Sequence, residues 1–433
     1  MRAPSKTFAS GFLVILLLLY VDLGWNARER ILQGNSDFII YYTAIQMVKD
    51  GKGSEIYDLS TAHRWQQRIL DEVQAPLNLQ NPFRAGLLYF VNPPMALAWF
   101  LPLRSFSYLQ ALLVWDLISV AFFIIGILVL VRKRVFKTLG FTTIAAFAFP
   151  PVFITLLQGQ VSALLFLATA LVYWSLRQKR EITAGLWLSL LLTKFQLLPP
   201  FLILFLWKRC WKVLGGFLLG SLGGLILSLQ WVGVAGIRKY FRLIVEMGRW
   251  VNQMGMTPRS MHCLRGQFNA WWYESHPWLA LILTAVCGIG LLVLLIREWG
   301  HRAKDDLELC YSLLVIVSVL TSPHLYIHDL SLLLVPGLIL FQKAEYLASQ
   351  RKKMGEGPVV GKNESSLNMI GDLVGRHLNL VLFSVGYPLL WMSVIISGLI
   401  PIQLSVWMLV FLFLALTRMP CCRSELPHSP QET

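Results

Sequence analysis

Long apolar runs with few charges recur along the chain, and short polar turns separate them. A helix needs about 20 apolar residues to span the hydrocarbon core, and lipid forces the backbone to satisfy its own hydrogen bonds. The pattern therefore predicts an all-α polytopic membrane protein of about 12 transmembrane helices. The expected unbroken spans are residues 8–25, 108–131, 140–157, 161–175, 213–232, 277–296, 307–322, 330–341, 380–397 and 400–417.

Two further apolar stretches do not fit a simple span. Residues 90–103 contain two adjacent prolines, and a crossing there would place the basic segment 132–137 on the outer side, so we expect an interfacial or re-entrant helix. The apolar run that begins at Thr183 is interrupted at residues 193–196 and again by two prolines. Broken helices occur at membrane depth where they line protein or a wet cavity, so this segment is expected to form a cavity wall.

The outer loops carry helical patterns of their own. In the first loop, one pattern begins after Asp37 and another after Ser60, each behind a residue type that caps helices. We expect these two helices to lie along the membrane surface. The second outer loop contains an amphipathic stretch, residues 237–250, whose basic residues are expected to reach lipid headgroups.

Composition agrees with this pattern. Hydrophobic residues make up 56% of the chain and charged residues only 14%, against about a quarter in average soluble domains. The net charge of +15 comes from short basic clusters between apolar runs, as the positive-inside rule requires of cytoplasmic turns. We therefore expect membrane and lipid partners and no nucleic acid, with both termini in the cytoplasm.

Several kinds of site are disfavoured by the sequence. The six cysteines have no paired spacing, so neither a disulfide framework nor a zinc site is expected. Cys421 and Cys422, after the last span, are either acylated or inert. There is no P-loop, no dinucleotide-binding glycine pattern and no DxD pair, which argues against a nucleotide-sugar mechanism on the inner face. We expect no metal and no cofactor.

Three acidic and basic residues are candidates for chemistry in or near the membrane. Asp37 lies shortly after the first span, where it can cap the following helix, act as a base at the membrane surface, or do both. Lys194 and Asp116 are ionisable residues inside expected spans, where each must face a cavity or a partner. They pair with each other, or Lys194 stabilises a phosphate.

A set of short motifs resembles glycosyltransferase family 87. The set includes Lys194 in the broken helix, Gly159 with Gln160 between two spans, and SPHLYIHD at residues 322–329. The remaining members are DFxxYY from Asp37, IYD at residues 56–58, NPP at residues 92–94 and residues 260–266. The family consists of GT-C enzymes related to mannosyltransferases that use polyprenyl-phosphate mannose, and the resemblance extends over residues 8–342.

The resemblance implies an outward-facing site. A hexose, by the resemblance mannose, would leave a polyprenyl phosphate donor and join a hydroxyl of a lipid-linked or glycolipid acceptor, with inversion at the anomeric carbon. Asp37 matches the acidic residue of the family's first loop, so its implied role is the general base that removes the acceptor proton. A phosphate leaving group is already acidic, so no general acid is essential.

The resemblance also assigns supporting roles. His328 matches a late-loop histidine that donates to phosphate or shares a proton with the base, although Asp329 stands where the family often has a second histidine. The alternative is that His324 and His328 only satisfy polar groups at a span end. The expected substrate-binding residues are Lys194 and Arg265 for phosphate, Gln160 for sugar hydroxyls, and Tyr41 and His324.

These inferences divide the chain into a GT-C-like catalytic unit (residues 1–342), a cytoplasmic linker (343–379), a transmembrane hairpin (380–418) and a cytoplasmic tail (419–433). The expected location is a bacterial inner membrane with the active site on the outer face. The main alternative function is a transporter or flippase of an amphipathic or lipid-linked substrate, because charged cavities and broken helices also serve alternating access.

Overall fold

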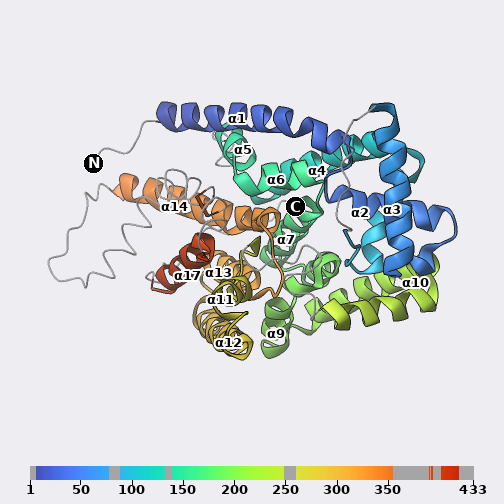
Figure 1. Cartoon of the computed structure of the whole chain (residues 1–433). Coiled ribbons are helices and arrows are strands. Elements are labelled where there is room, and N and C mark those ends of the chain that lie inside the picture. The colour runs from blue at the N-terminus through green and yellow to red at the C-terminus, as the bar shows by residue number, and fades with distance from the viewer. Residues whose placement is uncertain are drawn as a thin grey trace, which may run out of the picture.

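The computed structural model describes residues 6–77, 88–131, 139–247, 260–354, 390, 392–393 and 401–418. Every element within these ranges is an α-helix or a 3-10 helix, which confirms the all-α expectation. Figure 1 shows the helices, with α1 along one edge of the molecule and α12 near the opposite edge. The first elements in chain order are α1 (Lys6–Leu32), α2 (Phe38–Lys49), α3 (Leu59–Gln74), η3 (Pro94–Trp99), η4 (Leu101–Ser105), α4 (Tyr108–Leu130), α5 (Leu139–Phe147), α6 (Pro150–Gln158) and α7 (Ser162–Arg177).

The second half contains the broken segment and the late helices. Its elements are α8 (Glu181–Ser189), η6 (Leu190–Leu197), α9 (Pro199–Trp207), α10 (Trp211–Met247), α11 (Leu264–Trp272), α12 (Pro277–Arg302), α13 (Leu307–Thr321), η8 (Ile327–Leu333), α14 (Leu334–Met354) and α17 (Leu404–Thr417). Two short 3-10 helices, η1 (Gly53–Glu55) and η2 (Ala75–Leu77), flank α3.

Four helical segments among the described residues are long and apolar enough to cross a membrane: Tyr108–Leu130, Trp211–Met247, Pro277–Arg302 and Ile327–Ala344. The bent pair α5–α6 would make a fifth. The expected count of about 12 spans stays a prediction. Only 17% of the most apolar window of α12 is buried, against 72% for the segment that begins at Ile327, so α12 is peripheral and the late segment is central.

The expected span over residues 140–157 is wrong as a single straight helix. It consists of α5 and α6, which meet at an angle of 59°. Pro150 and Pro151 begin α6, and prolines at this position cannot continue the preceding helical hydrogen bonds. The neighbouring span expected at residues 108–131 is continuous, and Ser107 and Gln110 form a capping box at its start.

The expected break near Lys194 is confirmed. Helices α8 and α9 are separated by η6, and Lys194 within it has extended backbone angles of φ −131° and ψ 73°. The two prolines that begin α9 prevent one regular helix from running through this segment. Residues 90–103, also expected not to cross, form the irregular chain before η3, then η3 and the start of η4.

The expectation that both first-loop helices lie along the membrane surface stays a prediction. Helix α2 is largely covered by protein, because nine of its twelve residues are buried and it packs against η4 and α4. Tyr41 stacks on Phe100 with ring centroids 4.2 Å apart, and Phe38 contacts Tyr108 at 5.7 Å. The cap of α3 is Asp58, not Ser60, because the Asp58 carboxylate accepts the Thr61 N–H at 2.9 Å. This and neighbouring hydrogen bonds lower the pKa of Asp58 to about 2.

The amphipathic stretch of the second outer loop is helical as far as Met247, and Gly233, with φ 65° and ψ 179°, separates it from the span that precedes it in α10. One expected boundary differs. Helix α14 continues to Met354, so the first residues of the expected cytoplasmic linker are helical. Most of the first arm of the C-terminal hairpin, the tail with Cys421 and Cys422, and the segment with Arg249 and Arg259 lie outside the described residues.

Helices α8 and α10 cross at two glycines. A Cβ atom at Gly185 would lie 2.0 Å from the Val213 carbonyl oxygen, and one at Gly216 would lie 2.1 Å from the Ile182 carbonyl oxygen. Small residues let helix backbones approach this closely in membranes.

We therefore expect Gly185→Ala to force α8 and α10 apart and to lower stability by about 1–3 kcal/mol, the usual cost of overpacking. Gly215→Ala is the matched control, because its Cβ would have nothing within 4 Å. The measurement is thermal unfolding of both variants in the same detergent. Equal melting temperatures for the two variants would contradict the expected crossing.

Candidate functional site

Asp37 is held by the turn between α6 and α7. Its side chain makes no capping hydrogen bond to α2. Instead, Gln160 Nε2 donates to Asp37 Oδ2 at 2.5 Å, and the Asp37 N–H donates to Gln158 Oε1 at 3.1 Å. Tyr41 donates its hydroxyl to Gln160 Oε1 at 3.0 Å, which fixes the orientation of that amide. The structure therefore brings three expected site residues together: Asp37, Gln160 and Tyr41.

Gly159 allows this turn to approach α2. It ends α6 in the left-handed conformation, with φ 60° and ψ 38°. A Cβ atom there would lie 2.7 Å from Cβ of Phe38, the residue next to Asp37. Glycine meets both the backbone and the space requirement.

Burial raises the pKa of the Asp37 carboxyl above its ordinary value of 3.8. The hydrogen bond from Gln160 and the positive charge of Lys194 lower that pKa and so oppose the effect of burial, while the negative charge of Asp329 adds to it. The result is a carboxylate that binds a proton more strongly than an exposed aspartate does. This is the direction that suits a general base working near neutral pH.

Lys194 forms a buried ion pair with Asp329. Its ammonium donates to Asp329 Oδ1 at 2.6 Å and lies 3.1 Å from His328 Nε2. The side chains of Lys194 and Asp329 are 10% and 3% exposed, so the charges are almost wholly removed from solvent. Ser162 donates to the same Asp329 oxygen at 2.7 Å, and this hydroxyl completes the shell around the carboxylate.

The counter-charge of Lys194 is therefore Asp329 and not Asp116. In the described part of the chain, Oδ1 of Asp116 is buried in α4 without a hydrogen-bond partner. Sequence reasoning left the role of Asp329 open, although its place beside His328 was the available signal. A carboxylate next to a histidine in a span supplies the charge that a buried lysine needs.

The early motifs hold the break that carries Lys194. Asn92, from the NPP motif, donates through Nδ2 to the Thr193 carbonyl at 3.1 Å. Tyr57, from the IYD motif, donates its hydroxyl to the Asn92 carbonyl at 2.7 Å. These contacts link the first loop to the backbone immediately before Lys194.

The rings of His328, Tyr326 and His324 lie next to one another in this order. The Tyr326 ring lies 6.0 Å from that of His328 and 4.7 Å from that of His324, by ring centroids. Burial, mainly, lowers the pKa of His324 to about 4, so its ring is neutral at pH 7. Arg265 is half-buried and donates to the carbonyl of the exposed Pro323 at 3.2 Å. Tyr326 was missed as a site residue by the sequence, although it lies within SPHLYIHD.

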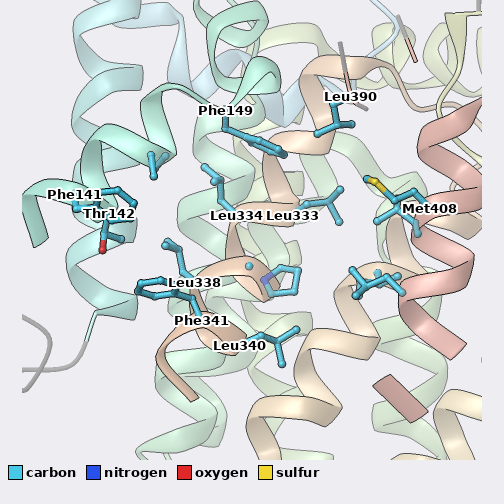
Figure 2. Close-up of a pocket in the computed structure, with 17 residues that line it drawn as sticks. Phe141, Thr142, Phe149, Leu333, Leu334, Leu338, Leu340, Phe341, Leu390 and Met408 are labelled. Atoms are coloured by element: carbon cyan, nitrogen blue, oxygen red, sulfur yellow. The ribbon is translucent and has the colours of Figure 1, made fainter. Parts of the chain in front are cut away.

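An apolar pocket lies beside the polar site. It has a cavity volume of about 100 Å³ and is lined by side chains from α5, η8, α13, α14 and α17, and by Phe149 and Leu390. Figure 2 shows Phe141, Phe149, Leu334, Leu338 and Met408 around it. Thr142 is the one lining residue with a polar side chain, so the pocket suits a hydrocarbon group.

Among the described residues, no group of three or more His, Cys, Asp or Glu side chains is placed to hold a metal ion. The polar site consists instead of carboxylates, amides, a lysine and histidines inside an apolar helical protein. The expectation of a metal-independent reaction stays a prediction.

The chain that carries this site also matches a family model. The model of glycosyltransferase family 87 matches residues 90–323, more than half of the 433 residues. The chain belongs to glycosyltransferase family 87, a family of GT-C-type membrane glycosyltransferases. The match includes Gln160, Lys194 and Arg265, whereas Asp37 and His328 lie on either side of it. No curated protein and no solved structure matches the chain.

Removing one partner of the buried ion pair should be more harmful than removing both. We expect Lys194→Met to lower stability by roughly 3–5 kcal/mol, because it leaves the Asp329 charge buried without its partner. The double variant Lys194→Met/Asp329→Leu should recover most of this loss. The free energy of unfolding is measured for these two variants and for Asp329→Leu alone in the same detergent. The three values give the coupling energy between Lys194 and Asp329. Strictly additive losses would contradict the pair.

Proposed function

We propose that this glycosyltransferase moves a hexose, by family resemblance mannose, from a polyprenyl phosphate donor to a lipid or glycan acceptor hydroxyl, with inversion and with Asp37 as general base. The observation that carries this proposal is the geometry of Asp37. Its carboxylate is buried, held by Gln160, and lies within the electrostatic reach of Lys194. A base, a cation and a histidine thus converge from distant parts of the chain.

The proposed base step follows from the hydrogen bonds of Asp37. Gln160 occupies Oδ2. A carboxylate has lone pairs to spare on both oxygens, so it can also accept the proton of a sugar hydroxyl. Proton removal increases the nucleophilicity of that oxygen as it attacks the anomeric carbon from the face opposite the phosphate. The phosphate departs with the bonding electrons, and the configuration at the anomeric carbon inverts.

Lys194 and His328 are the proposed phosphate contacts. The Lys194 ammonium has three donors, and one is directed to Asp329. In the proposed reaction, a further N–H of Lys194 and the adjacent His328 ring stabilise the charge that develops on the departing phosphate. Arg265 and His324, at the loop before His328, would also contact the donor. Tyr41 would act by orienting Gln160.

The apolar pocket supports a donor with a hydrocarbon chain. Leu333, one of its lining residues, follows Asp329 by four positions in η8. A 3-10 helix rises about 2.0 Å per residue, so the pocket begins roughly 8 Å along the axis from the ion pair. From there the lining continues down α14 to Phe341. A phosphate at Lys194 would therefore leave its chain beside an apolar wall.

The proposed orientation follows the basic clusters. The active site faces the outer side of a bacterial inner membrane, both termini lie in the cytoplasm, and the chain crosses about 12 times. The alternative is a transporter or flippase. Incubation of purified protein with labelled polyprenyl-phosphate hexose and membrane glycolipids separates the two, because a flippase moves the donor between leaflets without transferring the sugar.

Asp37→Asn should lower transfer by about 10²–10⁴-fold, the usual contribution of a positioned base, because the amide cannot accept the proton. The protein should remain folded, since asparagine has nearly the same shape. Asp50→Asn is the matched control: Asp50 is an exposed carboxyl at the other end of α2. Transfer of labelled hexose is measured for both variants, and wild-type turnover in Asp37→Asn would refute the assignment.

The raised pKa of Asp37 should appear in the pH profile. The base works only when deprotonated, so activity is lost as the pH falls through that pKa, at a pH above the ordinary value of 3.8. Gln160→Leu removes the hydrogen bond that lowers the pKa of Asp37, so the acidic limb should move to still higher pH. Donor-saturated rates against pH give the measurement. A limb that stays in place in Gln160→Leu speaks against Asp37 as the titrating base.

A further inference from the structure

The loop before His328 is held at three consecutive backbone carbonyls. Arg265 donates to the Pro323 carbonyl at 3.2 Å, and Gln196 Nε2 donates to the His324 carbonyl at 3.4 Å. The His262 N–H donates to the Leu325 carbonyl at 2.8 Å. Two of these three donors, Arg265 and His262, come from the short segment at the start of α11. The position of the loop therefore depends on where α11 lies.

Helix α11 is in turn attached to the beginning of α17. Gln267 is fully buried, and its Nε2 donates to the Pro401 carbonyl at 3.0 Å. Its Oε1 accepts the Gln403 N–H at 2.7 Å and the Trp407 indole N–H at 3.1 Å. One amide thus makes three hydrogen bonds to a segment more than 130 positions away in sequence. Buried amides with all partners in place define a rigid contact.

Two side contacts reinforce this attachment. His262 Nδ1 and Ser405 Oγ lie 2.7 Å apart. Burial lowers the pKa of His262 to about 4, so the ring is neutral at pH 7 and shares one proton with the hydroxyl. The Trp271 and Trp407 rings stack with centroids 5.7 Å apart. The first turn of α17 lies beyond residue 323, where the family match ends.

We propose that Gln267 is a positioning residue for the donor site, acting by fastening α11 to the first turn of α17 and so fixing the loop at residues 322–326. The consequence for donor binding rests on the proposed function, because it assumes that His324 and Tyr326 face the donor. The attachment of α11 to α17 does not depend on the proposed function. The C-terminal helix then positions the polar part of the donor site, in addition to lining the apolar pocket with Met408, Leu409 and Leu412.

The test compares Gln267→Leu, which removes all three hydrogen bonds at similar volume, with Phe411→Leu, an exposed position on α17. Amide hydrogen exchange is followed in the full-length protein without substrate. In Gln267→Leu, peptides covering residues 322–329 should exchange at least about tenfold faster, while those of α4 and α7 stay unchanged. Phe411→Leu should leave the loop at the wild-type rate. Unchanged exchange in the loop, or an equal increase in every helix, would overturn the proposal.

Kinetics provide the second measurement. Gln267→Leu should raise the KM for labelled polyprenyl-phosphate hexose about tenfold and leave the KM for the acceptor unchanged, a split that general destabilisation would not produce. Equal changes in both KM values would overturn the role in donor binding. If Gln267→Leu does not fold, Ser405→Ala replaces it, because it removes only one hydroxyl of the same attachment. It should change the loop exchange and the donor KM in the same direction by smaller amounts. If Gln267→Leu exchanges faster in the loop but the wild-type protein transfers no sugar, the attachment is supported and the proposed function is refuted.

Discussion

The ion pair between Lys194 and Asp329 is the interaction on which the rest of the site depends. A lysine inside a membrane protein is costly unless it meets a counter-charge or a cavity, and here both charges are almost completely shielded from solvent. The helix breaks at the lysine, and the neighbouring NPP motif binds the freed backbone through Asn92. His328 comes within 3.1 Å of the ammonium because it precedes the paired aspartate. Without the pair, the prolines that begin α9 would still interrupt the helix, but the buried lysine at the break would have no counter-charge.

A second centre lies close to the first and has a different character. Asp37 belongs to a turn-and-helix contact in which Gly159 permits the approach and Gln160 makes the hydrogen bond. Lys194 influences the pKa of Asp37 through space, without a direct hydrogen bond. The carboxylate proposed to accept a proton is therefore separate from the carboxylate that balances the lysine. In the proposed reaction, each can keep its own protonation state.

Sequence reasoning predicted the parts of the fold that follow from local chemistry. The break at Lys194 could be predicted from a polar residue followed by prolines in an apolar run, and α4 from a long apolar stretch with a single charged residue. The burial of α2 could not be predicted, because its aromatic residues suit a membrane interface as well as a protein core. Only the contacts with Phe100 and Tyr108 decide between the two. Likewise, the partner of Lys194 depends on which spans are neighbours. The sequence suggested Asp116 as the partner and left the role of Asp329 open, whereas the packing of η6 against η8 brings Asp329 to the lysine.

The order of the chain has a consequence for how the protein is made. Asp329 follows Lys194 by 135 residues. At about 5–20 residues per second, the lysine waits roughly 7–27 s for its counter-ion to be synthesised. During that interval an unmatched cation has to stay near water or be sheltered by the insertion machinery, so the broken segment cannot settle at its final depth on its own. Arrival of η8 neutralises it, which makes late insertion the step that locks the earlier half of the molecule.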